Sequence, residues 1–363
     1  MSTHDETYRS GSLEILTDED NDIYPRRTKA WRLFTVGTSN KYDLSEGIPF
    51  LTQKRVWEHG VKTELLWFLQ GKTNIKFLED RGVSIWTDNA FKNYVEETDR
   101  DLLEKEGSQE WDEEYKAFQE NIRNDEAFAQ RWGDLGRVYG HWWRGPPGRD
   151  QLGEALQGLK DGEKSTRYVV DAWSPKDVQN AVLPPCHYAF ELHEKSGELH
   201  TIVNQRSTDS FLGEPFNVAS YSVLTEYLAQ QAGLEPGMLH HNHGNHHFYI
   251  GFPGTEEDMG RARWYADDDN REYLRHRVEE IAEAEAWSQM KDLADTLDDK
   301  LPPGPPNKIY DHVPRVLEQY GNSMQEAPTV NIADKPIQEL DTDDITVSYE
   351  EGKPPSVRAT LSS

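Results

Sequence analysis

Cysteine, long apolar runs and positive charge are all scarce in this sequence. The single cysteine, Cys186, excludes an internal disulfide and any zinc site built from several cysteines. No run approaches the ~18 apolar residues of a membrane span, and residues 1–24 contain no apolar segment typical of a secretory signal. Lys and Arg number 39 against 66 Asp and Glu, a formal net charge of −27. Such a surface repels nucleic acids and anionic membranes, so we expect neither as a partner and expect a cytoplasmic protein.

The composition nevertheless favours a folded protein. Apolar residues make up only 35% of the chain, but 11 Trp and 16 Tyr supply large side chains for a core. A chain of 363 residues can bury a substantial core in one large or two ordinary domains. The acid excess has two explanations: adaptation to concentrated salt, which screens charges within about 3 Å at 1 M, and long solvated acidic loops. We favour the first and expect a halophilic protein.

The patterns along the chain predict one folded domain, residues 23–363, preceded by a loose acidic N-terminal arm, residues 1–22. Two acidic, helix-prone stretches are expected to be insertions, at about 92–135 and 251–305, and the first lacks the apolar density of a core. The other segments show helical or strand-like periodicity. They predict helices at 56–70, 218–232 and 313–320, strands at 31–38, 167–173, 188–192, 199–205 and 345–349, and a turn at Ser196–Gly197.

Cys186 lies in an unusual setting, after Pro184 and Pro185 and before His187. A fixed backbone before a thiol positions the sulfur, and a thiolate near neutral pH needs a nearby cation, because the usual pKa of a cysteine is about 8.5. Arg206 supplies that cation if the strand after Cys186 folds back as a hairpin. The alternative is a small buried hydrophobe, a common role for a free cysteine.

Other residues suit the recognition of a phosphorylated pyrimidine. Glu64 lies within an apolar helical pattern, as a buried functional acid or a structural carboxylate. Asn217 follows a Gly-x-Pro-Phe loop, and its amide matches the N3–H and O4 edge of uracil, unless it only caps the next helix. Arginines bind phosphate, and a thiol can add to an electron-poor carbon. The histidine run 240–247 is expected to serve loop packing and sugar contact rather than metal binding.

Taken together, these motifs resemble those of the thymidylate synthase family. The resemblance covers about residues 24–250 and, more faintly, the last thirty residues. The insertion at 92–135 also resembles a small extra domain of some bacterial members. The matching motifs, in family order, are Thr63–Gly71, Ile85–Trp86, Val138–Gly140, Pro185–His187, Gln205–Gly213, Pro215–Tyr221 and His247–Tyr249.

The resemblance implies catalytic roles for specific residues. Cys186 would add to C6 of dUMP, which makes C5 a nucleophile toward the one-carbon unit of 5,10-methylenetetrahydrofolate. Arg206 would favour the thiolate and bind phosphate, while Glu64 would organise water and relay protons around the C4 carbonyl. Tyr139 would help to remove the C5 proton, and His187 would belong to the polar network. Asn217 completes the implied catalytic set.

The resemblance also implies how substrates are held. Arg27, Ser207 and Arg206 would bind phosphate, Asn217 the uracil edge, and His247 with Tyr249 the 3′-hydroxyl of the sugar; Tyr310, in Tyr310–His312, competes weakly with Tyr249. Asp209 would bind the pterin ring. The folate slot would be lined by Ile85, Trp86, Leu183, Gly213 and Phe216.

The implied fold is α+β, a large mixed sheet flanked by helices that dimerises through the sheet face. Arg167 would reach across that interface into the partner's site. The co-substrate would leave as dihydrofolate, and no metal is expected. Departures from the family pattern include Thr166 in place of an arginine, Asn89 in place of a second tryptophan, and Asn245 in place of an aspartate. The last residues, 360–363, lack the apolar character of the family's terminal flap.

Alternative functions differ in the residues that they require. The nearest is a dUMP hydroxymethyltransferase, in which water captures the one-carbon intermediate; a dCMP version would need an aspartate in place of Asn217. A zinc nucleotide deaminase needs Pro-Cys-x-x-Cys, and Ala189 stands where its second cysteine would be. A non-catalytic nucleotide sensor or RNA-binding relative conflicts with the retention of Cys186, Glu64 and Tyr139, and the net charge conflicts with RNA.

Overall fold

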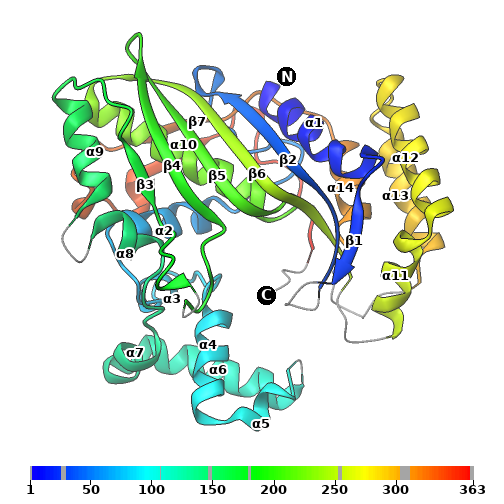
Figure 1. Ribbon diagram of the computed structural model, residues 1–363, viewed down its shortest axis with the longest axis horizontal. Helices are drawn as coiled ribbons and strands as arrows, with labels where there is room; N and C mark the ends of the chain where they lie inside the picture. The colour runs from blue at the N-terminus through cyan, green and yellow to red at the C-terminus, as the bar shows by residue number, and fades with distance from the viewer. Residues whose placement is uncertain are drawn as a thin grey trace.

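A computed structural model describes residues 2–25, 30–106, 108–145, 149–178, 181–251, 256–302 and 311–359. Within these ranges the main feature is a six-stranded mixed sheet in the order β1-β2-β6-β5-β4-β3 (Figure 1). β5 and β6 pair in parallel, and the other neighbours pair antiparallel. The α+β fold expected from the sequence is therefore confirmed. Its strands are β1 (Asp22–Pro25), β2 (Trp31–Asp43), β3 (Val169–Asp171), β4 (His187–Lys195), β5 (Glu198–Asp209) and β6 (Glu235–Gly251).

Helices cover one face of this sheet, and the other face carries none in the view of Figure 1. The long helix α10 (Gly213–Ala232) packs on β5 and β6, and α2 (Glu58–Leu69) packs on α10. Alternate strand residues such as Phe190, Leu192 and Val203 point to the covered face and are fully buried, as the period of two predicts. The core thus lies between the sheet and these two helices.

The predicted helices at 56–70 and 218–232 are confirmed, and glycines end both. Gly71 and Gly233 have φ values of 68°, a left-handed conformation that glycine adopts without steric cost. The hairpin turn at Ser196–Gly197 is also confirmed between β4 and β5. The histidine run, expected in a loop, is instead part of β6, because alternate side chains from Leu239 to His243 face the buried side of the sheet.

The prediction of a loose N-terminal arm is wrong. Residues Thr3–Thr17 form helix α1, which packs on β2. Tyr8, Ile15 and Leu16 are buried, and their spacing of about two turns puts them on one helix face. The Asp5 carboxylate accepts hydrogen bonds from the backbone N–H groups of Thr52 (2.9 Å) and Gln53 (3.0 Å). The sequence predicted a loose arm because this segment has few apolar residues and because Asp5, which is buried, was expected to face solvent.

The insertion at 92–135 forms a lobe that projects from the sheet domain (Figure 1). Its few apolar residues nevertheless form a small core, because its helices share an aromatic cluster. Phe91 and Phe118 are fully buried, and their rings lie 5.4 Å apart. Few but large rings stabilise the lobe, which explains its low apolar count. The helices are α4 (Thr87–Thr98), α5 (Arg100–Leu103), α6 (Gln109–Asn124) and α7 (Glu126–Trp132).

The insertion at 251–305 is helical, as expected from the sequence. Its helices lie beside α1 and α14 at one edge of the molecule (Figure 1). Arg9 of α1 places its guanidinium 3.6 Å from the ring centroid of Trp287, a cation–π contact between the two segments. The helices of the insertion are α11 (Glu256–Ala266), α12 (Asp268–Glu283) and α13 (Gln289–Lys300), and α14 (Val313–Tyr320) follows it.

The remaining elements are short. The predicted strand at 345–349 is confirmed as β8 (Ile345–Ser348), which pairs with β7 (Thr329–Ile332). The further short helices are α3 (Lys76–Glu79), α8 (Tyr139–Arg144) and α9 (Gln151–Lys160). In the described ranges, none of the helices combines the length and the apolar character needed to cross a bilayer.

Candidate active site

The hairpin of β4 and β5 brings Arg206 beside Cys186, as the sequence predicted. His187 pairs with Gln205, and the backbone N–H of Arg206 donates a 2.8 Å hydrogen bond to the carbonyl of Cys186. The guanidinium Nη2 lies 4.0 Å from Sγ of Cys186. The cysteine is only partly buried. A partly accessible sulfur next to a guanidinium is the setting in which a thiol becomes a nucleophile.

The two prolines before Cys186 explain how Arg206 is held in place. Its Nε donates to the carbonyl of Pro185 (2.8 Å), and its Nη2 donates to the carbonyl of Pro184 (2.7 Å). A residue before a proline is held in an extended conformation, so the direction of the Pro184 carbonyl is restricted. The planar fork of the arginine points N–H groups at both neighbouring carbonyls, a fixed geometry that the ammonium group of a lysine lacks. The Pro-Pro-Cys segment therefore orients the cation as well as the sulfur.

Tyr139 and His187 lie against the other side of Cys186. The backbone N–H of Cys186 donates to the hydroxyl of Tyr139 (2.8 Å). The rings of Tyr139 and His187 stack with centroids 4.0 Å apart and planes 9° apart. His187 Nδ1 lies 2.8 Å from the hydroxyl of Tyr221, a residue that the sequence suggested only as part of a helix face. Burial lowers the pKa of His187 to about 3 and raises that of Tyr139 well above 10, so both stay uncharged at neutral pH.

Glu64 and Trp86 form a second part of the site. Glu64 lies on α2, and the indole Nε1 of Trp86 donates a 2.6 Å hydrogen bond to its Oε1. Burial raises the pKa of Glu64 to about 7, while the hydrogen bond from Trp86 lowers it. A carboxyl group with this pKa can both accept and release a proton near neutral pH. Trp86 in turn lies close to Tyr139, with ring centroids 6.0 Å apart, which connects this pair to Cys186.

The end of β5 and the start of α10 bring Asp209, Gly213 and Asn217 together. A Cβ at Gly213 would lie 3.4 Å from Cβ of Asp209 and 4.0 Å from Oδ1 of Asn217. The Asp209 carboxylate accepts from the backbone N–H groups of Phe211 (3.0 Å) and Leu212 (3.2 Å). The turn thus places these three residues side by side, and its backbone N–H groups fix the carboxylate.

Asp209 also lies 3.3 Å from Nδ1 of His312, which follows the second insertion. Burial alone would raise the pKa of Asp209, but His312 and His247 lower it, and the net pKa is about 2. Asp209 is therefore an anion at the ligand-facing end of the sheet. The sequence associated the segment that includes His312 only with a weak sugar role; its contact with Asp209 comes from the fold and could not be found from spacing.

His247 and Tyr249 lie on β6 next to a residue that sequence reasoning missed, Arg32. Arg32 is opposite Tyr249 in the β2–β6 register, and its Nη2 donates a 2.6 Å hydrogen bond to the Tyr249 hydroxyl. The rings of His247 and Tyr249 meet edge to face with centroids 5.1 Å apart. An arginine inside a strand pattern, with apolar Leu33 beside it, was the available signal.

The structure places some of the other expected site residues, and two of them lie outside the described ranges. Ser207 is buried on β5 directly after Arg206. Ile85, Leu183 and Phe216 are half-buried and pack on the core, and Trp86 is buried. Arg27 and Tyr310 lie outside the described residues.

Arg167 is exposed and lies far from the thiol of Cys186. Asp171 pairs with Ala189 and Val169 with Glu191, so Arg167 lies level with His193. At about 3.3 Å per residue, that is roughly 20 Å along the strand from the Cys186 end.

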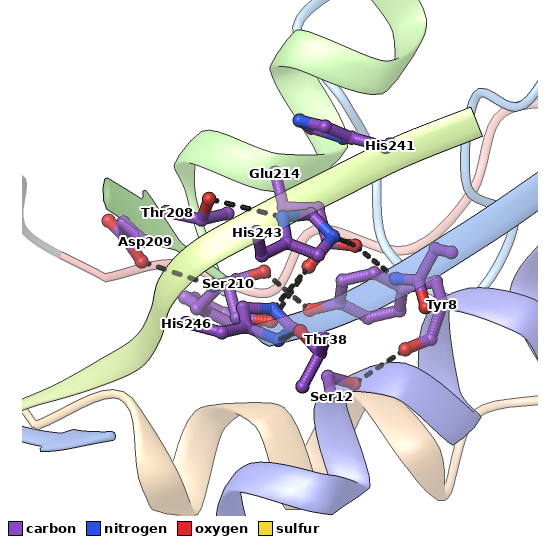
Figure 2. Close-up of polar contacts among 12 residues, drawn as sticks. Tyr8, Ser12, Thr38, Thr208, Asp209, Ser210, Glu214, His241, His243 and His246 are labelled. Atoms are coloured by element: carbon purple, nitrogen blue, oxygen red, sulfur yellow. Dashed lines mark hydrogen bonds and ion pairs between the residues drawn. The ribbon is translucent and has the colours of Figure 1, made fainter. Parts of the chain in front are cut away.

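A buried polar cluster lies between β6 and helix α10, near Asp209 (Figure 2). Its centre is the fully buried Glu214, whose Oε2 lies 2.9 Å from Nε2 of His246 and accepts from Ser210 (2.9 Å). Its Oε1 accepts from Asn40 (2.6 Å) and lies 3.5 Å from Nε2 of His243. Sequence reasoning missed Glu214; the histidines of β6 were the only hint of a buried acid.

This cluster is also the place in the described ranges where donor atoms suit a metal ion. The donor atoms of Glu214, His243 and His246 lie within 4.8 Å of one another. The two imidazole rings, however, stack with planes 13° apart and centroids 4.4 Å apart. The lone pair of an imidazole nitrogen lies in the ring plane, so nearly parallel rings do not converge on one ion. Thr38 and Thr208 orient the rings through Nδ1, at 2.9 and 3.1 Å, and hydrogen bonds account for the arrangement.

The geometry as a whole supports covalent chemistry at one carbon of a polar, anionic ligand. It combines the partly accessible sulfur of Cys186 near a guanidinium and the Glu64 carboxyl group with a pKa near neutrality. It also includes the protonated hydroxyl of Tyr139, which accepts a hydrogen bond from the backbone N–H of Cys186. These are a nucleophile, an acid–base group and an orienting donor in mutual proximity.

Comparisons with known proteins agree with this arrangement. A family model described as thymidylate synthase matches residues 7–361. The chain is 37% identical over 241 residues to the thymidylate synthase of Mesoplasma florum, which covers 66% of this chain and 80% of the relative. It is 41% identical over 239 residues to the thymidylate synthase of Listeria monocytogenes serotype 4b, which covers 61% of this chain and 76% of the relative. The family match begins within α1 and extends past β8, so it includes the sheet and both insertions.

Proposed function

Because the chain belongs to the thymidylate synthase family, we propose that it catalyses the reductive methylation of dUMP to dTMP with 5,10-methylenetetrahydrofolate. It is thus a methyltransferase whose co-substrate leaves as dihydrofolate, and the family needs no metal. The observation that carries the proposal is the placement of Cys186, with its sulfur 4.0 Å from Nη2 of Arg206 and its backbone N–H bound to Tyr139.

The first step is addition of the Cys186 sulfur to C6 of the uracil ring. The S–C6 bond forms, and the electron pair of the C5–C6 double bond moves toward C5 and the C4 carbonyl oxygen. Arg206 stabilises the thiolate that attacks, and Glu64 supplies or orients a proton at the C4 oxygen. The pKa of Glu64 near 7 suits this exchange at neutral pH.

In the second step, C5 attacks the one-carbon unit and then loses its own proton. Tyr139 stays protonated, because burial raises its pKa well above 10, so we assign it a role in directing that proton through its hydrogen bonds rather than as a phenolate base. Elimination then breaks the bond between the one-carbon unit and N5 of tetrahydrofolate and leaves an exocyclic methylene on C5. Tetrahydrofolate delivers a hydride to this methylene, which completes the methyl group, and the C5–C6 double bond re-forms as the Cys186 sulfur leaves C6. His187, neutral and bound to Tyr221, keeps Tyr139 oriented.

Substrate contacts follow from the same site. Asn217 reads the uracil edge, and Arg206, Ser207 and Arg27 bind the phosphate. His247 and Tyr249 hold the sugar hydroxyl. We assign the pterin ring to Asp209, which is held as an anion, and the slot around it to Ile85, Trp86, Leu183, Gly213 and Phe216.

We further propose a homodimer that forms through the uncovered face or edge of the sheet. In the part of the chain that the structure describes, the exposed large apolar residues Val36, Val169 and Tyr188 lie on its strands. Exposed apolar side chains on an uncovered sheet fit a protein interface. Arg167, roughly 20 Å along the strand from its own Cys186 end, is then free to bind phosphate in the partner's site.

Mixing two inactive variants tests this composite site. Cys186→Ser lacks the nucleophile, and Arg167→Ala lacks the partner's cation. A hybrid dimer contains one site with both residues intact, so we expect activity to return after the two variants are mixed and allowed to exchange subunits. Mixtures that stay inactive while light scattering shows a dimer would contradict the shared site.

An assay with dUMP and methylenetetrahydrofolate tests the reaction itself. Methylation forms dihydrofolate, which absorbs near ~340 nm, whereas hydroxymethylation leaves tetrahydrofolate and a heavier nucleotide. We expect the absorbance to rise in step with dTMP, and no signal from Cys186→Ser. Formation of 5-hydroxymethyl-dUMP without dihydrofolate would contradict methylation.

We also infer a cytoplasmic protein adapted to salt. A net charge of −27 repels two anionic substrates except near the arginines, and salt screens that repulsion. Activity is therefore expected to rise, with falling Michaelis constants, from dilute buffer to molar salt. A steady loss of activity over that range would contradict the inference.

A further inference from the structure

Arg32 is a buried cation next to the residues assigned to the sugar hydroxyl. It lies on β2 opposite Tyr249 of β6, and only 7% of the residue is exposed. Its Nη2 donates a 2.6 Å hydrogen bond to the Tyr249 hydroxyl, and its guanidinium carbon lies 4.7 Å from the centroid of that ring. Burying a guanidinium costs free energy unless partners compensate, and here the compensating partner is Tyr249.

The contact fixes the direction of the Tyr249 hydroxyl. A guanidinium has donors and no acceptor, so the phenol oxygen must accept from Arg32. The phenol hydrogen then points away from Arg32. Burial raises the pKa of Tyr249 to about 12, although Arg32 lowers it, so the hydroxyl keeps its hydrogen at neutral pH. Tyr249 thus offers one donor to a ligand.

The neighbouring His247 offers the opposite group. Its Nδ1 lies 3.3 Å from the carbonyl oxygen of Asn245, which can only accept, so Nδ1 carries the hydrogen. Burial, and then the charge of Arg32, lower the pKa of His247 well below 6.5, so the ring is neutral. Its Nε2 is then a bare acceptor, and this buried atom has no hydrogen-bond partner within the described ranges.

A donor and an acceptor side by side complement a hydroxyl group, which both donates and accepts. We propose that Arg32 is a positioning residue that sets this polarity and so makes the site select a nucleotide with a free sugar hydroxyl. This inference rests on the proposed function for the identity of the nucleotide. A sugar without that hydroxyl leaves the buried Nε2 of His247 and the Tyr249 hydroxyl unpaired, and sites of this kind reject such analogues strongly.

The test compares dUMP with 2′,3′-dideoxy-UMP in turnover by the wild type, Arg32→Leu, Tyr249→Phe and the double variant. We expect the wild type to prefer dUMP by about 100-fold or more in kcat/KM. Each single variant is expected to reduce that preference by about tenfold or more, and the double variant to reduce it little further, because both changes remove the same oriented donor. Arg277→Leu, which changes a surface arginine of α12 paired with Glu280, serves as the control and should keep the full preference.

The outcomes separate this inference from the proposed function. If the wild type turns over dUMP but Tyr249→Phe or a folded Arg32→Leu keeps the full preference, the inference is overturned. Tyr249→Phe removes a single oxygen, so it decides the question even if Arg32→Leu fails to fold. If the wild type turns over neither nucleotide, the proposed function fails, and the same ratios are then measured as dissociation constants by calorimetry. Equal affinity of the wild type for both nucleotides would overturn the inference in that case.

Discussion

The indole of Trp86 donates a 2.6 Å hydrogen bond to the carboxyl group of Glu64, across the gap between helix α2 and the start of the projecting lobe. Burial raises the pKa of Glu64 to about 7, and this hydrogen bond is the interaction that lowers it. Trp86 therefore tunes the pKa of Glu64, the carboxyl group to which we assign the acid–base role.

Replacing Trp86 by Phe is expected to shift the pH dependence of kcat toward higher pH. Loss of a hydrogen bond worth about 1 kcal/mol raises the pKa of Glu64 by somewhat less than one unit. Glu64→Gln should lower kcat by about 100-fold or more. It should also stabilise the fold above pH 7. A buried carboxyl group with a raised pKa destabilises the folded state when it ionises, and glutamine does not ionise. Trp57→Phe, which changes an exposed indole, is the control. An unchanged pH profile in Trp86→Phe would contradict the tuning role.

Arg206→Lys should lower kcat/KM by about 100-fold, although charge is conserved. A lysine ammonium lacks the planar fork that reaches the carbonyls of Pro184 and Pro185 through two different nitrogens, so the cation loses its fixed place near Sγ of Cys186. Because Cys186 is the only cysteine, its rate of alkylation by iodoacetamide reports on this one thiol. We expect slower alkylation in Arg206→Lys than in the wild type. Equal alkylation rates would show that Arg206 does not activate the sulfur.

The sequence predicted most residues around the reactive thiol, but few of the residues that hold them in place. Cys186, Arg206 and Tyr139 meet as predicted because they lie on or next to strands and helices whose periodicity is clear, and a hairpin aligns them. Arg32, Tyr221 and Glu214 were missed because their roles depend on which strands become neighbours. Parallel pairing of β5 and β6 is not visible in local sequence, and it brings His243 to Thr208 and Glu214.

The fold of the segments outside the sheet was predicted less well, for a related reason. Helix α1 reads as a loose acidic arm because only a few of its residues are apolar, yet Tyr8 and Ile15 are fully buried. The lobe at 92–135 reads as coreless because rings such as Phe91 and Phe118 are few. Burial depends on what covers a side chain, and composition cannot show it.

The cluster around Glu214 predicts acid sensitivity of the fold. The histidines of the cluster lower the pKa of Glu214 against the effect of burial, and burial lowers that of His243 despite Glu214. Groups with depressed pKa values stabilise the fold above their unfolded values and lose that contribution as pH falls. We expect the free energy of unfolding to fall by about 2 kcal/mol or more between pH 6.5 and 4. His243→Gln should show a smaller fall.

Urea unfolding at several pH values measures this effect, and EDTA provides the control for a metal. Because the stacked rings do not converge on one ion, EDTA should leave the unfolding midpoint unchanged at pH 7. A midpoint lowered by EDTA and restored by zinc would overturn the hydrogen-bond account. An equal fall with pH in wild type and His243→Gln would place the acid-sensitive group elsewhere.

His312→Ala is expected to weaken folate binding more than catalysis. His312 lies 3.3 Å from Asp209, and the preceding Asp311 is held by Tyr265 (3.0 Å) and Arg261 (3.2 Å) of α11. The second insertion therefore helps to position the Asp209 carboxylate, to which we assign the pterin ring. We predict about a tenfold rise in KM for methylenetetrahydrofolate with kcat within about twofold, and partial rescue in His312→Gln. A fall in kcat with unchanged KM would contradict this positioning role.

The central claim is that Cys186 forms a covalent bond with the pyrimidine. Incubation with 5-fluoro-dUMP and methylenetetrahydrofolate, followed by mass spectrometry of the intact chain and its peptides, tests it most directly, because fluorine at C5 blocks the proton removal that releases the sulfur. The account predicts a stable adduct on the peptide that contains Cys186 and none with Cys186→Ser. An unmodified Cys186 peptide in an enzyme that still makes dTMP, or full activity in Cys186→Ser, would contradict it.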